Sequence, residues 1–287
     1  MCLAALALGV LGLVSARGEI ASSRGLDRIL ALANLSIALP LAVFSALHFA
    51  GPQFVSDVVP PFMPWRMFWV YFVGAALMST ALSVAARIEV RLSGLLFGLM
   101  MFLFVAMIHL PGAICHPHNR IVRTIVFREM SFGGAGWILA GLAMSARGVQ
   151  PAKTLIAVGR AFVTIAMVVF GVEHFFHPTG LPVVPLEKQM PAWVPAGALI
   201  DYLTGTLLLI AAGSILLNRS ARTVVSFLGA WILALMVFIY TPVLFSGLAG
   251  SNVGGQIEGV NYFADTLLFA GAVLAVAKAT PRSAVAG

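Results

Sequence analysis

Two adjacent pairs of residues carry groups that can exchange protons: Glu173 with His174, and Asp201 with Tyr202. Consecutive residues on a helix point about 100° apart, so the members of a pair face different neighbours. The second pair lies on the next apolar segment at a similar depth, which allows an acid, an imidazole and a phenol to meet between two helices. Imidazole changes charge near neutral pH, and carboxyl groups act as acids or bases. These four residues form the predicted ligand-binding site.

A quinone is the ligand that this chemistry would suit. A histidine can donate a hydrogen bond to a quinone carbonyl, and the aromatic rings of Phe175, Phe176 and Trp193 can flank a flat ligand. A structural role is the alternative. In that case His174 and Tyr202 hydrogen-bond across two helices and hold the Pro-rich loop between them. The sequence assigns no catalytic residue.

An earlier stretch repeats this pattern with fewer ionisable groups. The recurring histidines and tyrosines lie 126 or 131 positions apart: His48 and His174, Tyr71 and Tyr202, and His109 with Tyr240. Both carboxylates are missing from the earlier copy, where Leu47 stands in place of Glu173. His48, Tyr71 and His109 are therefore predicted to form the counterpart of the first site. An internal repeat decides the fold class, and this chain reads as two versions of one unit.

Composition identifies the medium in which the chain folds. Hydrophobic residues make up 61% of the sequence and charged residues 9%, and the mean hydropathy is +1.02. A water-soluble domain of this length cannot have such a surface. The apolar runs are long and lack the alternation of a membrane barrel, so they are expected to be helices that satisfy their own backbone hydrogen bonds in lipid. The predicted class is an all-α integral membrane protein.

Eight segments are expected to cross the bilayer, since about 20 apolar residues span its core. They are 29–50, 65–86, 92–112 and 126–146, followed by 155–176, 191–217, 224–244 and 262–279. The short apolar segment 1–16 is expected to be an extra or interfacial helix and not a removed leader. The predicted organisation is an N-terminal segment with a charged linker (1–27), a four-helix unit (28–146), a linker (147–153) and a second unit (154–287).

Four helices per unit make the two units parallel, because each enters and leaves on the same side of the membrane. This disfavours an inverted-repeat transporter. Of the 17 Lys and Arg residues, most lie on the side of the first helix start; the exceptions are Arg66, Arg120, Arg123, Arg128 and Lys188. The positive-inside rule then places the C-terminus in the cytoplasm and the histidine-rich loops outside, in a bacterial inner membrane. The net charge of +7 is thus explained by topology and indicates no nucleic-acid binding.

No metal site is predicted. Cys115, His116 and His118 are close together, but zinc sites need two ligand pairs at characteristic spacing, so a solvated loop is favoured. Haem is disfavoured although two histidines can ligate iron axially. His48 and His174 each lie at the outer end of a helix, where a buried tetrapyrrole would have few walls.

The motifs resemble those of the DoxX family of small four-helix membrane proteins. The resemblance rests on aromatic-x-x-x-His-Phe at the end of a first helix, a Pro-rich loop with Met-Pro, and Tyr-x-x-Gly in a second helix. It covers residues 28–146 and 153–279, so the chain is similar to a fused tandem pair, and the second half fits better. One branch of the family forms the membrane subunit of a thiosulfate:quinone oxidoreductase.

The resemblance implies an accessory subunit of a quinone-linked redox or sulfur-oxidation system. Its expected partners are the lipid bilayer, a quinone, and a membrane or extracytoplasmic redox protein. The sequence contains no nucleophile motif, phosphate-binding loop or dinucleotide fingerprint, which favours an accessory subunit over a self-contained enzyme. The alternative function is a non-catalytic scaffold or assembly partner that docks another protein through its outer loops.

Overall fold

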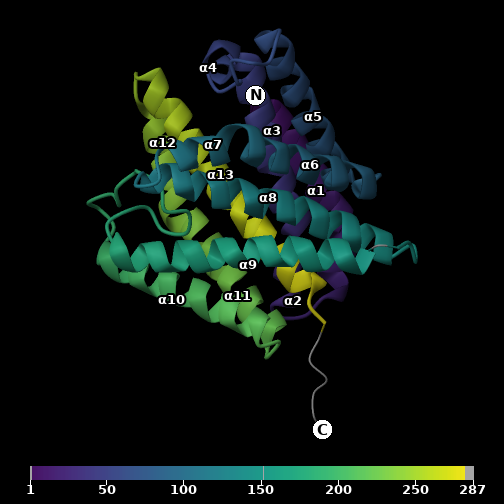
Figure 1. The fold of residues 1–287 in the computed structure, drawn as a ribbon. Coiled ribbons are helices and arrows are strands. Elements are labelled where there is room, and N and C mark those ends of the chain that lie inside the picture. The colour runs from purple at the N-terminus through teal and green to yellow at the C-terminus, as the bar shows by residue number, and fades with distance from the viewer. Residues whose placement is uncertain (1, 151, 282–287) are drawn as a thin grey trace.

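The computed structural model describes residues 2–150 and 152–281, and these form a helical protein (Figure 1). Within these ranges the only β-type pairing is an isolated bridge between Gly180 and Gln189. Met1, Pro151 and residues 282–287, which the predicted segments include, lie outside the described residues.

The helices fall into two successive groups. The first group contains α1 (Cys2–Ser22), α2 (Asp27–Leu30), α3 (Ala33–Ala50), α4 (Pro52–Ser56), α5 (Arg66–Ala86), α6 (Val90–Phe104), the π-helix η1 (Val105–His109), α7 (Leu110–Cys115) and α8 (Arg120–Ser145). The second contains α9 (Ala152–Phe176), α10 (Gly197–Leu216), α11 (Ala221–Leu235), the π-helix η2 (Met236–Tyr240), α12 (Thr241–Ala249) and α13 (Val253–Ala279).

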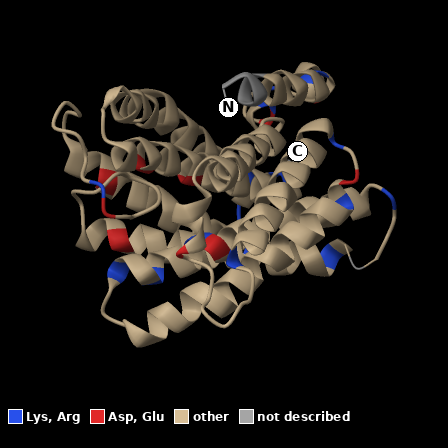
Figure 2. Cartoon of the chain, turned by 90° about the horizontal axis from the view of Figure 1, so that it is seen from above, with Lys and Arg blue, Asp and Glu red and all other residues tan. Residues whose placement is uncertain are grey.

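Seven of the described helical segments are long and apolar enough to cross a membrane, so the chain is an all-α integral membrane protein. They are Asp27–Ala50, Arg66–Ala86, Val90–Cys115, Ala152–Phe176, Gly197–Leu216, Ala221–Ala249 and Val253–Ala279. Seven of the eight expected spans lie largely within them. The eighth, 126–146, lies in α8, which is not among the seven and carries Arg120, Arg123, Arg128 and Glu129. Charged residues are sparse elsewhere in the cartoon (Figure 2).

Three helix starts differ from the sequence-based expectation by six residues or more, and one of them is α8, which begins at Arg120 and not at residue 126. Helix α10 begins at Gly197 and not at residue 191, because the Pro-rich loop continues to Ala196, whose φ is +52°. Helix α13 begins at Val253, nine residues before the expected Tyr262. Asn252 caps it by accepting a hydrogen bond from the Gly254 N–H, as Asn119 caps α8 through the N–H groups of residues 121 and 122.

Unusual backbone conformations recur in the two groups at one spacing. Three pairs of non-glycine residues with positive φ are separated by 131 positions: Trp65 and Ala196, Arg87 and Asn218, and Glu89 and Ser220. The π-helices η1 and η2 are separated by the same 131 positions. Positive φ is uncommon for residues with a side chain, and π-helices are rare, so both features mark specific local geometry.

Helix α13 lies at the centre of the molecule. The last helix of each group packs against the first long helix of the other group. Helix α8 packs along α9, and α13 packs along α3 and against α8 and α11 (Figure 1). Between α8 and α9 the backbones approach so closely that a Cβ built on Gly134 would lie 2.7 Å from the Gly159 carbonyl oxygen. Such contacts between small residues are a main source of helix association in lipid.

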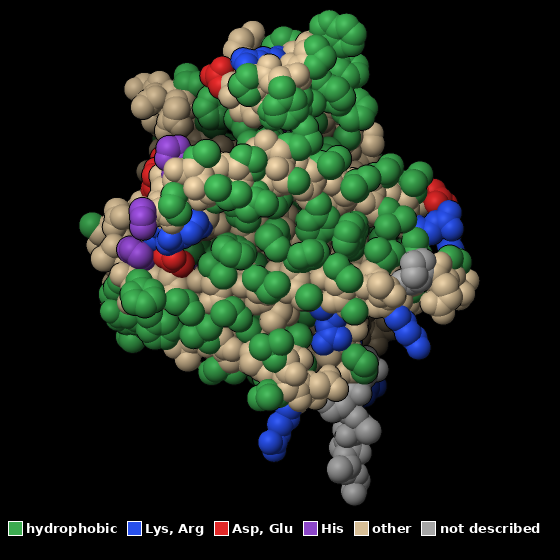
Figure 3. All heavy atoms as spheres, viewed as in Figure 1, with side chains coloured by type: hydrophobic (Ala, Val, Ile, Leu, Met, Phe, Trp, Pro, Cys, Tyr) green, Lys and Arg blue, Asp and Glu red, His purple; other side chains and the backbone are tan. Residues whose placement is uncertain are grey.

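The surface matches a protein surrounded by lipid. Apolar side chains cover the broad middle of one face, whereas basic side chains lie around it, at the lower and right margins, at the top and beside the histidines on the left (Figure 3). At the end of the helices where α1 and α13 finish, Glu19 pairs with Arg87 at 2.8 Å and with Lys278 at 2.6 Å. Burial alone would raise the pKa of the Glu19 carboxyl group, but these two cations outweigh it and lower the pKa.

Candidate functional site

His174, near the end of α9, is buried and has both ring nitrogens occupied. Its Nδ1 lies 2.6 Å from the Phe170 carbonyl oxygen, and its Nε2 accepts a hydrogen bond of 2.9 Å from the Val183 N–H. An Nε2 that accepts is unprotonated, so Nδ1 carries the proton and donates it to the carbonyl. The imidazole is therefore neutral and links the helix to the loop between α9 and α10.

That loop, residues 177–196, is irregular in backbone but largely buried in its middle. Leu181, Val183 and Val184 are each at most 1% exposed, and Val183 has φ +81°, a strained value for a β-branched residue. Four helices supply the bonds that hold the loop. His174 accepts from the Val183 N–H, and the Tyr240 hydroxyl donates to the Pro182 carbonyl. Arg120 donates to the carbonyls of Pro185 and Leu186, and the Tyr262 hydroxyl accepts from the Lys188 N–H.

Asp201 of α10 lies beside His174 without forming a salt bridge. Its Oδ1 is 3.7 Å from His174 Nε2, which is already used by Val183, so a neutral imidazole offers the carboxyl group no proton there. Asp201 is 1% exposed, and its carboxyl group lies near the Gly180 N–H, yet neither oxygen completes a hydrogen bond of ordinary geometry. A buried carboxyl group with so little compensation is energetically costly.

The other two predicted residues face elsewhere. Glu173 pairs with His177 at 3.1 Å and lies 3.8 Å from Arg123 of α8. Tyr202 is 40% exposed and packs its ring against Phe175, with centroids 5.8 Å apart. The structure thus brings His174 and Asp201 together in the interior, and it places Glu173 and Tyr202 in two separate environments. A direct bond between His174 and Tyr202, which the structural alternative included, is absent from the described contacts.

The counterpart residues reproduce part of this arrangement. His48 Nδ1 lies 2.8 Å from the Phe44 carbonyl oxygen, and Tyr71 packs against Phe49 with centroids 5.9 Å apart. Both histidines pack closely against a glycine of the neighbouring helix. A Cβ built on Gly74 would lie 2.9 Å from the His48 Cβ, and a Cβ built on Gly205 would lie 2.9 Å from the His174 Cβ. Among the described contacts, His48 Nε2 makes no loop bond like that of His174.

His109 and Tyr240 occupy the last positions of the two π-helices but differ in environment. Tyr240 is fully buried and donates to the loop, whereas His109 is half-buried. Its nearest charged groups are Glu129 and Arg128 of α8.

An ion cluster in the interior was not predicted from the sequence. Arg128 of α8 donates to Asp265 of α13 and to Glu129, each at 2.7 Å, and all three side chains are at most 17% exposed. One guanidinium facing two carboxylates leaves one negative charge uncompensated unless the cluster holds a proton. The available signal in the sequence was the presence of charged residues inside long helical segments, Arg128 and Glu129 in α8 and Asp265 in α13.

The potential metal ligands do not assemble. Cys115, His116 and His118 are exposed, and no group of three or more His, Cys, Asp or Glu side chains that could hold a metal ion occurs among the described residues. For haem, His174 has no free nitrogen lone pair while Val183 bonds to it, so ligation of iron would require release of the loop.

In comparisons with family models, curated proteins and solved structures, nothing matches this chain. The chemistry must therefore be judged from the geometry. The arrangement offers a neutral imidazole and a buried carboxyl group where α9 ends and α10 begins, and a buried three-residue ion cluster between α8 and α13. Such groups can store and transfer protons. Tyr202, the residue after Asp201, is partly exposed at the surface.

We predict that His174→Ala weakens the loop more than His48→Ala does. Without Nε2, the buried Val183 N–H loses its partner, which costs about 1–3 kcal/mol, whereas His48 holds no loop segment. Hydrogen exchange across residues 180–186 and thermal unfolding in detergent would measure the difference. Equal effects of the two substitutions would show that His174 does not hold the loop.

We also predict that Arg128→Met destabilises the protein by about 3–5 kcal/mol, because it leaves Asp265 and Glu129 buried without a cation. Adding Asp265→Asn and Glu129→Gln to the same chain should recover much of that loss, since no buried charge then remains. Chemical unfolding of the single, double and triple variants forms the necessary cycle. Strictly additive losses would mean that the three groups do not interact energetically.

Proposed function

We propose that this protein is a DoxX-like accessory membrane subunit of a quinone-linked redox or sulfur-oxidation system. The observation that carries the proposal is the set of buried ionisable groups, Asp201 with His174 and Arg128 with Asp265 and Glu129, inside helices surrounded by lipid. Ionisable groups at such depth are expensive and commonly mark proton or ligand pathways. The resemblance of the sequence motifs to the DoxX family supports the same function.

The proposed chemistry divides the reaction between two proteins. A partner redox protein supplies two electrons, the quinone takes them up with two protons, and a quinol leaves into the bilayer. This chain holds the quinone ring at Phe175 and Tyr202, whose rings are both about two-fifths exposed at the surface of α9 and α10. The Tyr202 hydroxyl donates to a quinone carbonyl, and Trp193 of the loop covers the ring. The carboxyl groups of Glu173 and Asp201 supply the protons.

The proposed architecture is two parallel four-helix units, 28–146 and 154–287, with eight spans when α8 is counted. Three pairs of positive-φ residues and the two π-helices support this duplication through their common spacing of 131. Helix α8 has 26 residues, a length of about 39 Å, which exceeds a hydrocarbon core of about 30 Å. The distribution of Lys and Arg supports a bacterial inner membrane location with a cytoplasmic C-terminus.

A non-catalytic scaffold is the second candidate, and one observation favours it. Both nitrogens of His174 are used in holding the loop 177–196, so this residue contributes to a rigid outer surface without needing a ligand. Exposed residues on that surface available for a partner protein are His177, Thr179, Glu187 and Trp193. Replacing the whole segment 177–189 would remove buried residues, so a docking test must change only these exposed positions.

Native mass spectrometry of the protein released from its own membranes separates the two functions. If the proposal is right, a quinone is retained, and Tyr202→Phe weakens its retention roughly threefold to tenfold, the effect of one hydrogen bond. Tyr71→Phe is the matched control, because Tyr71 packs in the same way on Phe49 in the first unit. Retention of a stoichiometric protein partner and no quinone would contradict the redox proposal. Loss of that partner when His177 and Glu187 are changed to Ala would support the scaffold function.

A further inference from the structure

A groove lies between α5 and α6, at the end of these helices opposite to His48. It encloses about 520 Å³, within the range of roughly 300–1,000 Å³ typical of small-molecule sites. Its lining is mainly apolar and includes Ala76, Leu82, Leu92, Leu96, Phe97 and Met100. Both helices are candidate membrane spans, so this groove lies along the part of the surface that lipid surrounds.

Larger side chains stand at several, but not all, of the corresponding positions of the second helix pair. The residues 131 positions after four lining residues are Leu207 for Ala76, Ile210 for Ser79, Phe227 for Leu96 and Trp231 for Met100. Trp231 also donates a hydrogen bond of 3.0 Å across the α10–α11 contact to Thr204. At other lining positions the second helix pair has the smaller residue, such as Ala211 for Thr80 and Gly213 for Leu82, so the α5–α6 groove differs from the α10–α11 contact in shape and not in total side-chain bulk.

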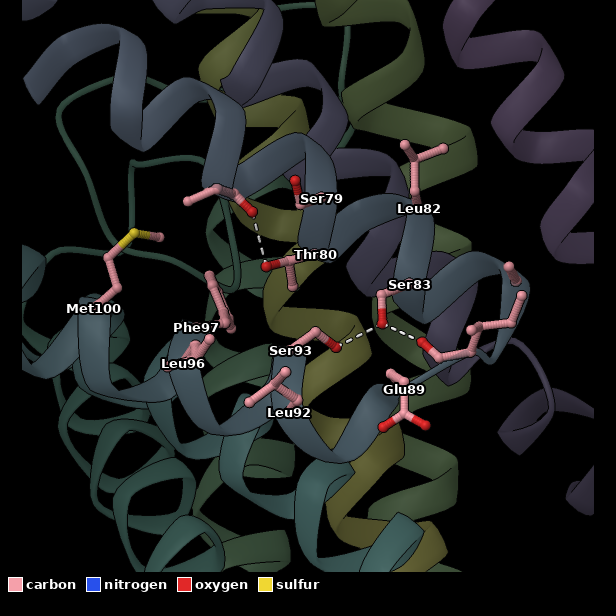
Figure 4. Close-up of a pocket in the computed structure, with 13 residues that line it drawn as sticks. Ser79, Thr80, Leu82, Ser83, Glu89, Leu92, Ser93, Leu96, Phe97 and Met100 are labelled. Atoms are coloured by element: carbon pink, nitrogen blue, oxygen red, sulfur yellow. Dashed lines mark hydrogen bonds between the residues drawn. The ribbon is translucent and has the colours of Figure 1, made fainter. Parts of the chain in front are cut away.

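The charged residue of the groove lies at one end, whereas the hydroxyl groups of Ser79 and Thr80, further along α5, bond to carbonyl groups of their own helix. Figure 4 shows Ser83, Ser93 and Glu89 together near the α5–α6 turn, while Phe97 and Met100 line the other end. Ser83 and Ser93 are 2.7 Å apart and bond to each other, so these hydroxyl groups are already partnered. Glu89 is the charged lining residue, and its Oε1 lies 3.6 Å from an Arg147 guanidinium nitrogen, with both side chains 55% exposed.

We propose that this groove binds an aminophospholipid. One acyl chain lies along the apolar lining, and the headgroup sits at the α5–α6 turn. There the ammonium group donates to Glu89 while the phosphate accepts from Arg147. An exposed, loosely spaced pair of opposite charges complements a headgroup that carries the same two charges in reverse. The site is separate from the proposed quinone site and stands without it.

The test uses the purified, delipidated protein titrated with dioleoyl phosphatidylethanolamine, phosphatidylcholine or phosphatidylglycerol and followed by native mass spectrometry. One phosphatidylethanolamine is expected to bind more tightly than either of the other two. Glu89→Gln should weaken it roughly threefold to fivefold, the effect of losing one exposed charged contact. Ala76→Leu with Ser79→Ile, the residues of the second helix pair, should weaken it at least about tenfold by filling the groove.

Ala75→Leu is the matched control, because it adds the same bulk at an exposed position of α5 that does not line the groove. Leu96→Phe fills the groove from α6 and serves if the double variant does not fold. Unchanged phosphatidylethanolamine binding in a folded, filled variant overturns the proposal. Equal affinity for phosphatidylcholine, whose headgroup has no N–H donor, also overturns it, as does a dimer that forms through the groove and excludes lipid.

Discussion

Lipid offers no hydrogen bonds to the backbone, and this constraint decides most of the structure. Helices satisfy the requirement within themselves, which explains why an apolar chain of this length becomes almost entirely helical. The buried loop 177–196 cannot do so, and it depends on side chains from the surrounding helices. His174, Tyr240, Arg120 and Tyr262 bond to its backbone groups. A histidine that a sequence pattern assigns to chemistry is thus also part of the support for an irregular segment.

The same medium gives the buried charges their importance. Arg128 binds two carboxylates, one from its own helix and one from α13, and so joins the last helices of the two groups in the interior. Replacement of such a cluster by apolar residues would remove the desolvation cost, so its presence suggests selection for something besides stability. The burial of Asp201 beside a neutral imidazole supports the same conclusion. These groups are the physical basis for proposing proton-coupled chemistry in this protein.

Several backbone features recur in the two halves of the chain, while the side chains at the corresponding positions differ. Positive-φ residues at the helix starts and turns, the π-helices and the glycine contacts of His48 and His174 follow one pattern. The two halves differ in the side chains at corresponding positions. The second half has the carboxyl groups of Glu173 and Asp201 and the loop 177–196, while the first half has a groove where Ala76 and Met100 stand in place of Leu207 and Trp231. The proposed quinone site and the proposed lipid groove lie in different halves of the chain, which is consistent with this divergence.

The sequence by itself determined the class of protein, the positions of most helices and the recurrence of His48 and Tyr71 as His174 and Tyr202. Hydropathy and residue spacing are local properties, so they can be read without the fold. Only the tertiary structure decided which groups meet. The direction of a side chain around a helix depends on packing, and packing placed Asp201 beside His174, turned Tyr202 towards Phe175, and joined Arg128 to Asp265 across 137 positions. Helix α10 also starts later than its apolar run suggests, and the loop before it is held by distant residues that no local pattern reveals.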